Sequence, residues 1–224
     1  MLYILDTADI DAIRHCNEFY PLAGVTTNPS IIAKEHTDFW DLVEEIRDII
    51  GDEKMLHIQT TQKTAEAIIE EAKLVKERIR GNFFIKIPIG EEGLKATMEL
   101  KKLGIGVTMT AIFTPAQALV AAMAGASFVA PYVNRLDNII SDGIEVVTEI
   151  VKQLKIYNSD CRVLAASFKN AEQVHRCACV GCHSVTVDDE ILKTLISHPM
   201  TDMAIRNFDK DWTSVYGDKK ILDL

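Results

Sequence analysis

The sequence of 224 residues lacks any long hydrophobic run. A membrane-spanning helix needs about 20 mostly apolar residues in a row, and no segment approaches that length. The first six residues contain no Lys or Arg and end in the acidic Asp6, which does not fit a secretory signal peptide. We therefore expect a cytoplasmic protein that has no membrane partner.

Basic residues are few relative to acidic ones. The chain has 24 Lys and Arg against 33 Asp and Glu, which gives a formal net charge of -9. Proteins that bind nucleic acid or anionic membranes usually present a surplus of positive charge. We expect no nucleic-acid partner, and any bound anion must be held by local groups.

Cysteine is scarce, and its count of five is odd. Without a secretory context, this favours reduced thiols over a disulfide framework. Three of the thiols, Cys177, Cys179 and Cys182, lie close together, but no second cluster supplies the paired ligands of a usual zinc site. We interpret them as small side chains that pack a helix onto a sheet, with metal binding as the less favoured alternative.

Nucleotide-binding glycine motifs are also missing, since neither G-x-G-x-x-G nor a Walker sequence occurs. Their absence disfavours a doubly wound open sheet, although that fold stays the alternative. No linker, charge block or low-complexity segment marks a boundary, so residues 1–224 are expected to form one domain.

Short apolar segments that read as strands alternate with polar and apolar helical patterns along the chain. The eight expected strands are residues 3–7, 24–28, 56–60, 83–88, 106–112, 128–134, 162–167 and 184–187. Strand and helix in regular alternation predict a parallel sheet, and eight such units predict a (β/α)8 TIM barrel. Residues 197–224 then form a C-terminal helical extension, with a helix expected over residues 197–216.

Local sequence signals mark the expected helix ends. Thr114 followed by Pro115 and Gln117 predicts a capping box, and Asn170 predicts a second N-cap. Thr7, Thr61 and Asp188 are further candidate caps. Glycines fall where helices should stop, namely Gly51, Gly81, Gly104, Gly125 and Gly181.

Polar side chains close every expected strand. In a (β/α)8 barrel the C-terminal strand ends surround the active site, so these side chains are candidates for it. They are Asp6, Thr26, Thr27, Asn28, Gln59, Lys86, Thr108, Thr110, Tyr132, Asn134, Arg135, Ser167, Thr186 and Asp188. Arg135 and Lys169 add positive charge for a substrate phosphate. Most histidines fall on expected helices or loops, and His57 reads as a core residue, so we expect no metal site.

Lys86 is the most unusual of these residues because it interrupts an otherwise apolar strand. Burial in an apolar site lowers the pKa of a lysine and makes the neutral, nucleophilic amine accessible, as Schiff-base chemistry requires. The alternative is a strand-end lysine whose stem lies on apolar surface while its ammonium reaches water.

Five segments combine the motifs described so far. They are Leu5-Asp6-Thr7, residues 22–30 (LAGVTTNPS), Ile85-Lys86-Ile87-Pro88, residues 130–135 (APYVNR) and Ala165-Ala166-Ser167. Together they closely resemble the short transaldolases and fructose-6-phosphate aldolases, over residues 2 to about 215. The resemblance implies a class I aldolase on a (β/α)8 barrel, without cofactor or metal, in which Lys86 forms a Schiff base with a dihydroxyacetone unit.

The resemblance also implies roles for the other candidates. Asp6 and Asn28 would contact donor hydroxyls and orient the lysine. A water held by Gln59, Thr110 and Tyr132 would carry protons, with the Tyr132 phenol as general acid and base.

The implied substrate contacts lie at the rim of the barrel. Arg135 and Ser167 would hold the phosphate, and we add Thr26 and Lys169 to the substrate-binding residues. Members are typically decamers of two pentamers in which the C-terminal helix packs on a neighbour, so a homodecamer is expected.

Two positions bear on the reaction. Members similar to transaldolases carry glutamate and phenylalanine where this chain has Gln59 and Tyr132, whereas fructose-6-phosphate aldolases resemble this chain at both. The leading hypothesis is reversible cleavage of fructose 6-phosphate to dihydroxyacetone and glyceraldehyde 3-phosphate. The alternatives are a transaldolase, which passes the same unit from a ketose phosphate to an aldose phosphate, and a non-catalytic phosphosugar-binding barrel.

Overall fold

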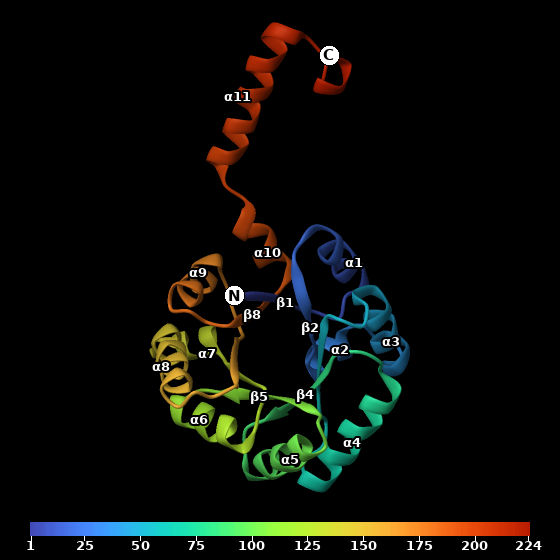
Figure 1. Cartoon of the computed structure of the whole chain (residues 1–224), viewed down its shortest axis with the longest axis vertical. Helices are drawn as coiled ribbons and strands as arrows, with labels where there is room; N and C mark the ends of the chain where they lie inside the picture. The colour runs from blue at the N-terminus through green and yellow to red at the C-terminus, as the bar shows by residue number, and fades with distance from the viewer.

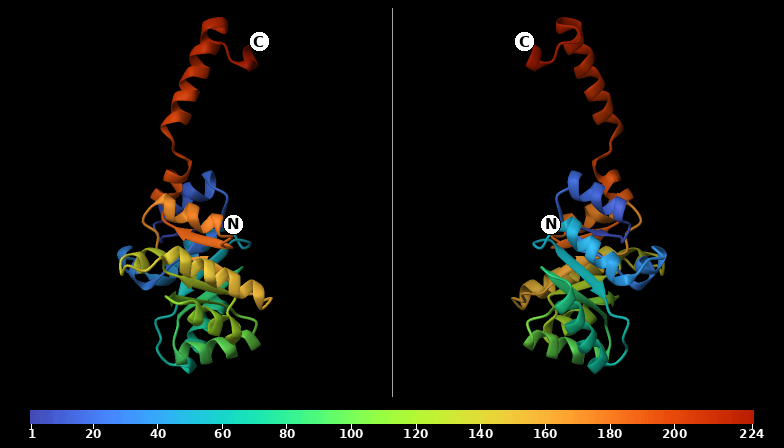
Figure 2. Two further views of the ribbon diagram at one scale, coloured as in Figure 1. Left: turned by 90° about the vertical axis from the view of Figure 1, so that its left-hand side faces the viewer. Right: turned by 90° about the vertical axis from the view of Figure 1, so that its right-hand side faces the viewer.

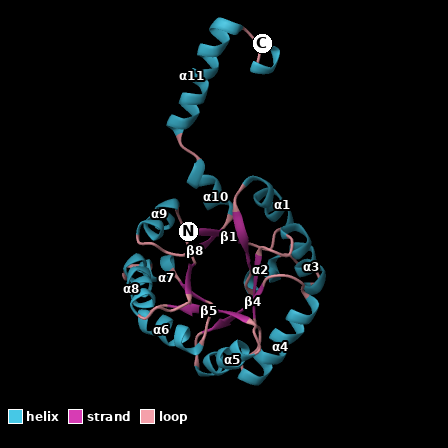
Figure 3. Ribbon diagram, viewed as in Figure 1, coloured by secondary structure: helices cyan, strands magenta, loops and turns pink.

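The computed structural model describes residues 1–224 and contains a closed barrel of eight parallel strands surrounded by helices (Figures 1 and 3). The strands are β1 (Leu2–Asp6), β2 (Leu22–Thr26), β3 (Met55–Gln59), β4 (Phe83–Pro88), β5 (Gly106–Ile112), β6 (Phe128–Pro131), β7 (Arg162–Ala165) and β8 (Ser184–Val187). They pair in chain order, and β8 closes the barrel against β1. The predicted (β/α)8 fold is confirmed.

Helices connect successive strands around the outside of the barrel. They are α1 (Ile10–Phe19), α2 (Pro29–Lys34), α3 (Phe39–Ile50), α4 (Ala65–Arg78), α5 (Glu91–Lys102), α6 (Pro115–Ala124), α7 (Val133–Asp137), α8 (Gly143–Ile156), α9 (Ala171–Cys179) and α10 (Asp189–Ile196). Helix α11 (Pro199–Tyr216) and a short 3-10 helix (Ile221–Asp223) follow. No helix is both long enough and apolar enough to cross a membrane.

The sixth strand is shorter than predicted. It ends at Pro131. Tyr132, which makes an isolated bridge with Ala166, is the N-cap of the short helix α7, so the strand does not extend to Asn134. The chain turns there because the N–H groups of Val133 and Asn134 donate to the carbonyls of Ala166 and Ser167, which follow β7. Strands β1, β2 and β3 begin one or two residues earlier than expected, and β7 ends two residues earlier.

Several predicted helix ends are confirmed. Thr114 and Gln117 form the capping box of α6, while Asn170 and Asp188 cap α9 and α10. Gly125 ends α6 with a φ of 103°, in the left-handed region that favours glycine.

Two predicted caps are wrong. Asp9 caps α1, and the Thr7 hydroxyl only accepts a hydrogen bond from the Asp9 N–H. Thr64 caps α4, while the N–H and hydroxyl of Thr61 donate to the Glu71 carboxylate.

Aromatic rings fill the barrel interior toward the N-terminal ends of the strands. His57 stacks on Phe84 with 4.8 Å between ring centroids, and Phe128 meets both rings edge-on. Gly106 leaves room for this arrangement, since a Cβ there would lie 2.5 Å from the Phe84 ring. The three rings form a barrel floor that separates the two ends of the barrel.

The C-terminal helix extends away from the barrel. Helix α11 points outward from the end of α10, and the C-terminus lies far from the strands (Figures 1 and 2). None of its residues is buried, although Ile205, Phe208 and Val215 are large and apolar. The expected C-terminal helix is present, beginning at Pro199 and not at residue 197.

Candidate active site

Two adjoining cavities open at the C-terminal ends of the strands. The inner chamber measures about 150 Å³ and the outer one about 810 Å³. The sequence analysis gives a role in the site to ten of the candidate residues, and the inner chamber contains eight of these ten, namely Asp6, Thr26, Asn28, Lys86, Thr110, Tyr132, Arg135 and Ser167. Gln59 and Lys169 line the outer chamber, which shares Asp6, Asn28, Tyr132, Arg135 and Ser167 with the inner one. The structure therefore brings all ten residues to one site.

Lys86 is buried inside this site. Only 6% of the residue is exposed, and its Nζ donates a hydrogen bond to the Thr27 carbonyl at 2.7 Å. Burial lowers the pKa of Lys86 below its ordinary value, and the charge of Asp6 partly opposes that shift. The amine thus lies in the chamber, and the interpretation of an ammonium that reaches bulk water does not describe it.

Asp6 is held by a chain of hydroxyl groups. The Thr26 hydroxyl donates to Asp6 Oδ1 at 2.7 Å and also lies within hydrogen-bond distance of the Thr186 hydroxyl. Thr26 and Thr186 are both buried, with exposed fractions of 0% and 3%. The Thr26 hydroxyl is therefore occupied by neighbouring side chains.

Asn28 serves two purposes at the end of β2. Its Oδ1 accepts a hydrogen bond from the Ile31 N–H at 3.0 Å and so caps α2. Its Nδ2 makes no hydrogen bond within the protein and can donate to a ligand in the chamber.

The Tyr132 phenol also lines the inner chamber. The Tyr132 oxygen is 3.1 Å from the Thr110 hydroxyl, and the Phe113 ring packs edge-on against the Tyr132 ring. The Arg135 guanidinium also lies over the Tyr132 ring, 4.7 Å from its centroid. Gln59 is in register with Lys86 on the neighbouring strand, but it bonds neither Thr110 nor Tyr132 directly.

Positive charge and strained backbone meet at the rim. Arg135 and Lys169 are exposed and line the outer chamber together with the half-buried Ser167. Ser167 has a φ of 61°, and Ala111 on β5 has a φ of 57°, values that non-glycine residues seldom adopt. Such strain is often found at ligand-binding positions.

Some predicted site residues lie elsewhere. The Thr108 hydroxyl is 2.9 Å from His57 Nδ1 at the barrel floor, below the chamber, and not in the barrel mouth with Thr110. Asn134 accepts a hydrogen bond from Gln173 and does not line either chamber, because β6 ends before it.

Other contributors were not among the ten selected residues. Thr186 was visible as a polar strand end, but its contact with Thr26 depends on barrel closure. The Thr27 carbonyl that receives the Lys86 hydrogen bond is a backbone group, and no side-chain pattern indicates it.

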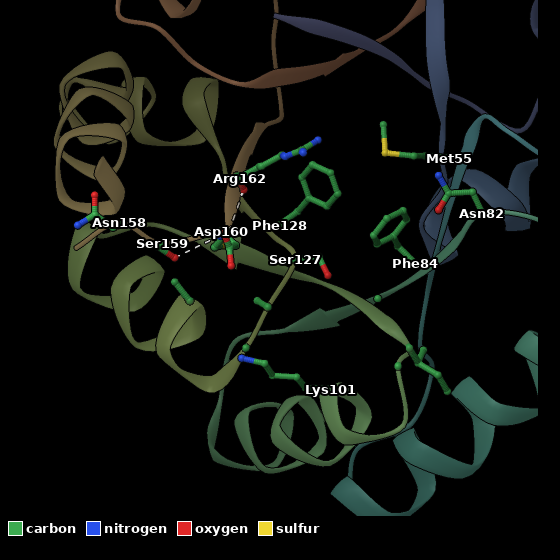
Figure 4. Close-up of a pocket in the computed structure, with 17 residues that line it drawn as sticks. Met55, Asn82, Phe84, Lys101, Ser127, Phe128, Asn158, Ser159, Asp160 and Arg162 are labelled. Carbon is green, nitrogen blue, oxygen red and sulfur yellow. Dashed lines mark hydrogen bonds between the residues drawn. The ribbon is translucent and has the colours of Figure 1, made fainter. Parts of the chain in front are cut away.

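Another cavity, of about 700 Å³, lies at the opposite end of the barrel (Figure 4). Phe84, Phe128, Lys101 and Arg162 are among the residues that line it. Its thiol, Cys161, has a pKa raised to about 12 by burial, so it remains protonated at neutral pH. Barrel enzymes carry their active sites at the other end of the barrel, where the strands have their C-terminal ends.

The clustered cysteines divide between core and surface. Cys177 and Cys182 are buried where α9 meets β8, whereas Cys179 is exposed. The structure contains no group of three or more His, Cys, Asp or Glu side chains placed to hold a metal ion.

Together, the closed barrel and a buried lysine among a carboxylate, a phenol and rim cations have the form of a barrel enzyme equipped for amine chemistry. The sequence model of the family described as Transaldolase/Fructose-6-phosphate aldolase matches residues 3–219. The chain belongs to this family, a group of Schiff-base enzymes that act on sugar phosphates. The resemblance drawn from the motifs is confirmed.

Proposed function

We propose that this protein is a Schiff-base aldolase that reversibly cleaves fructose 6-phosphate to dihydroxyacetone and glyceraldehyde 3-phosphate. The observation that supports it most is the buried Lys86, whose pKa is lowered by burial inside a polar chamber. A lowered pKa increases the fraction of neutral amine, which is the nucleophile that attacks a ketone.

The proposed reaction begins at the ketose carbonyl. The Lys86 amine adds to C2, and the carbinolamine loses water to give an iminium ion. The C4 hydroxyl loses its proton, the C3–C4 electron pair moves to form the enamine, and glyceraldehyde 3-phosphate leaves. Protonation of the enamine at C3 and addition of water then release dihydroxyacetone and the free amine.

Tyr132 is the proposed acid and base for these proton transfers. Its phenol oxygen lies 3.1 Å from the Thr110 hydroxyl, and both groups line the chamber that contains Lys86. Because Gln59 bonds neither group directly, we propose that a water joins the three and transfers the proton between Tyr132 and the substrate.

The two chambers suit the two parts of the substrate. We assign the dihydroxyacetone portion to the inner chamber of about 150 Å³, with Asp6 and Asn28 toward its hydroxyls. The phosphate end would lie in the outer chamber between Arg135, Ser167 and Lys169, where charge-assisted hydrogen bonds are available.

A trapping experiment tests the covalent step. Incubation with dihydroxyacetone and borohydride should add the mass of one reduced adduct to a peptide containing Lys86. Lys86→Met should gain no mass, whereas Lys152→Met, which removes an exposed lysine on α8, should be labelled like the parent chain. An unlabelled parent would overturn the mechanism.

The alternative within the family is a transaldolase, and Gln59 bears on the choice. This side chain is uncharged and lies in register with Lys86, so it adds no negative charge beside the enamine intermediate. Steady release of free dihydroxyacetone from fructose 6-phosphate alone would support the aldolase. Turnover that requires an added aldose phosphate acceptor would reject it.

A further inference from the structure

Thr186 is a buried residue of the inner chamber that has no role in the proposed mechanism. It lies on β8 and is in register with Ile4 of β1, the strand that ends in Asp6. Its exposed fraction is 3%, and it lines both chambers.

The number of available protons sets the direction of the hydroxyl chain. The Thr26 hydroxyl has a single proton, and it donates that proton to Asp6 Oδ1 at 2.7 Å. The short contact between Thr26 and Thr186 must therefore use the proton of Thr186. The chain runs from Thr186 to Thr26 to Asp6, and each hydroxyl donates toward the carboxylate.

We propose that Thr186 is a positioning residue for Asp6, acting through Thr26. Thr186 occupies a lone pair of Thr26, which leaves the Thr26 proton directed at the carboxylate and fixes one Asp6 oxygen. The second oxygen of Asp6 then faces the chamber for the donor hydroxyl and Lys86. This inference rests on the proposed aldolase function, in which Asp6 orients the donor and the lysine.

Without the Thr186 hydroxyl, Thr26 is free to rotate. Its proton can then turn toward another acceptor, and the Asp6 carboxylate loses its directed donor. A directed hydrogen bond to a charged group is among the stronger ones, so its loss is expected to slow the reaction about tenfold, which corresponds to about 1.4 kcal/mol. We expect the loss to appear mainly in kcat, since Thr186 positions groups instead of binding the phosphate.

Thr186→Val removes the hydroxyl at nearly constant shape, and Thr186→Ser restores it. The valine variant should lower kcat for fructose 6-phosphate cleavage about tenfold with a smaller change in KM, whereas the serine variant should stay within about threefold of the parent. The control is Thr97→Val, which removes an equally buried hydroxyl on α5 that donates to the Gly93 carbonyl. It should lower the melting temperature without lowering kcat.

A double-mutant cycle tests whether the effect passes through Asp6. In an Asp6→Asn background, Thr186→Val should slow the formation of the trapped dihydroxyacetone adduct by less than twofold, against about tenfold in the parent. Thr186→Ala provides a second hydroxyl-free variant if the valine chain does not fold.

Three outcomes would overturn the role of Thr186. They are an unchanged kcat in Thr186→Val, an equal loss in the serine and valine variants, and additive losses in the Asp6→Asn background. Failure of the proposed function is distinguishable, because then the parent chain itself would form no adduct on Lys86.

Discussion

Lys86 is placed where a charged side chain is costly. It lies within β4 and receives a single protein hydrogen-bond acceptor, the Thr27 carbonyl, in place of the water shell of a free ammonium. Asp6 favours the charged form, but burial has the larger effect on the Lys86 pKa. A residue that lowers stability in this way fits a functional site better than a structural one.

Lys86→Met should therefore stabilise the protein while it abolishes turnover. Methionine fills a similar volume without the desolvation cost, and a gain of about 1–3 kcal/mol is expected. Thermal unfolding would show this as a melting temperature several degrees above that of the parent. A lower melting temperature would mean that the hydrogen bond to Thr27 outweighs the cost of burial.

The rate of Schiff-base formation should also reveal the lowered pKa of Lys86. The neutral amine is present above the pKa of the folded protein, so the rate of adduct formation should rise with pH and level off once that pKa is passed. Because the pKa lies below the ordinary 10.5, the midpoint should lie below pH 10.5 as well. A rate that still rises steeply above pH 10.5 would contradict this.

The barrel floor joins side chains of β3, β4 and β6 beneath the active site. His57 from β3 is fully buried between aromatic rings, and burial, with a smaller effect from the Lys86 charge, lowers its pKa to about 3. Its Nε2 is buried without a hydrogen-bond partner. The ring is therefore neutral at physiological pH and serves as part of the packed floor.

This neutral histidine should make the protein sensitive to acid. Between pH 6.5 and about 3 the unfolded chain binds a proton at His57 that the folded chain does not, so stability falls as the pH falls through that range. In His57→Phe this contribution disappears. When the free energy of unfolding is measured with urea at pH 7 and pH 4, it should fall less between the two pH values for His57→Phe than for the parent, by several kcal/mol.

The matched control for this prediction is His15→Gln, because His15 is exposed on α1. Its loss of stability between the two pH values should equal that of the parent. An equal loss in His57→Phe would contradict the buried, neutral state of His57.

The sequence predicted elements and strand-end residues well because both depend on local patterns. Lys86, Gln59 and Thr110 lie in one site because the C-terminal ends of all the strands of a parallel barrel lie at the same end of the barrel. Tyr132 was placed in a strand, whereas hydrogen bonds to the segment after β7 turn the chain into α7. No local pattern indicates such contacts.

The remaining site features depend on barrel closure and backbone geometry. The contact of Thr26 with Thr186 joins residues 160 positions apart, across the seam where β8 meets β1. The left-handed backbone of Ser167 is equally invisible, since serine carries no preference for that conformation.

On the scale of the whole molecule, the barrel and α11 differ in how they are stabilised. The strands of the barrel and the helices around them share a core of 46 buried residues, whereas α11 projects into solvent with no buried residue (Figure 2). Ile205, Phe208 and Val215 share one face of this helix and are 60–72% exposed. We propose that residues 1–224 form one domain whose C-terminal helix packs on neighbouring copies in a homodecamer.

Sedimentation tests this assembly. The parent should sediment as a species near ten times the 25.0 kDa chain mass, and Phe208→Asp should shift it to smaller species. An aspartate forced into an apolar contact costs several kcal/mol, and a closed assembly repeats that cost at every copy. Thr213→Asp adds the same charge away from the apolar face and should leave the mass unchanged. A parent that sediments at 25.0 kDa would instead mean that α11 remains exposed in solution.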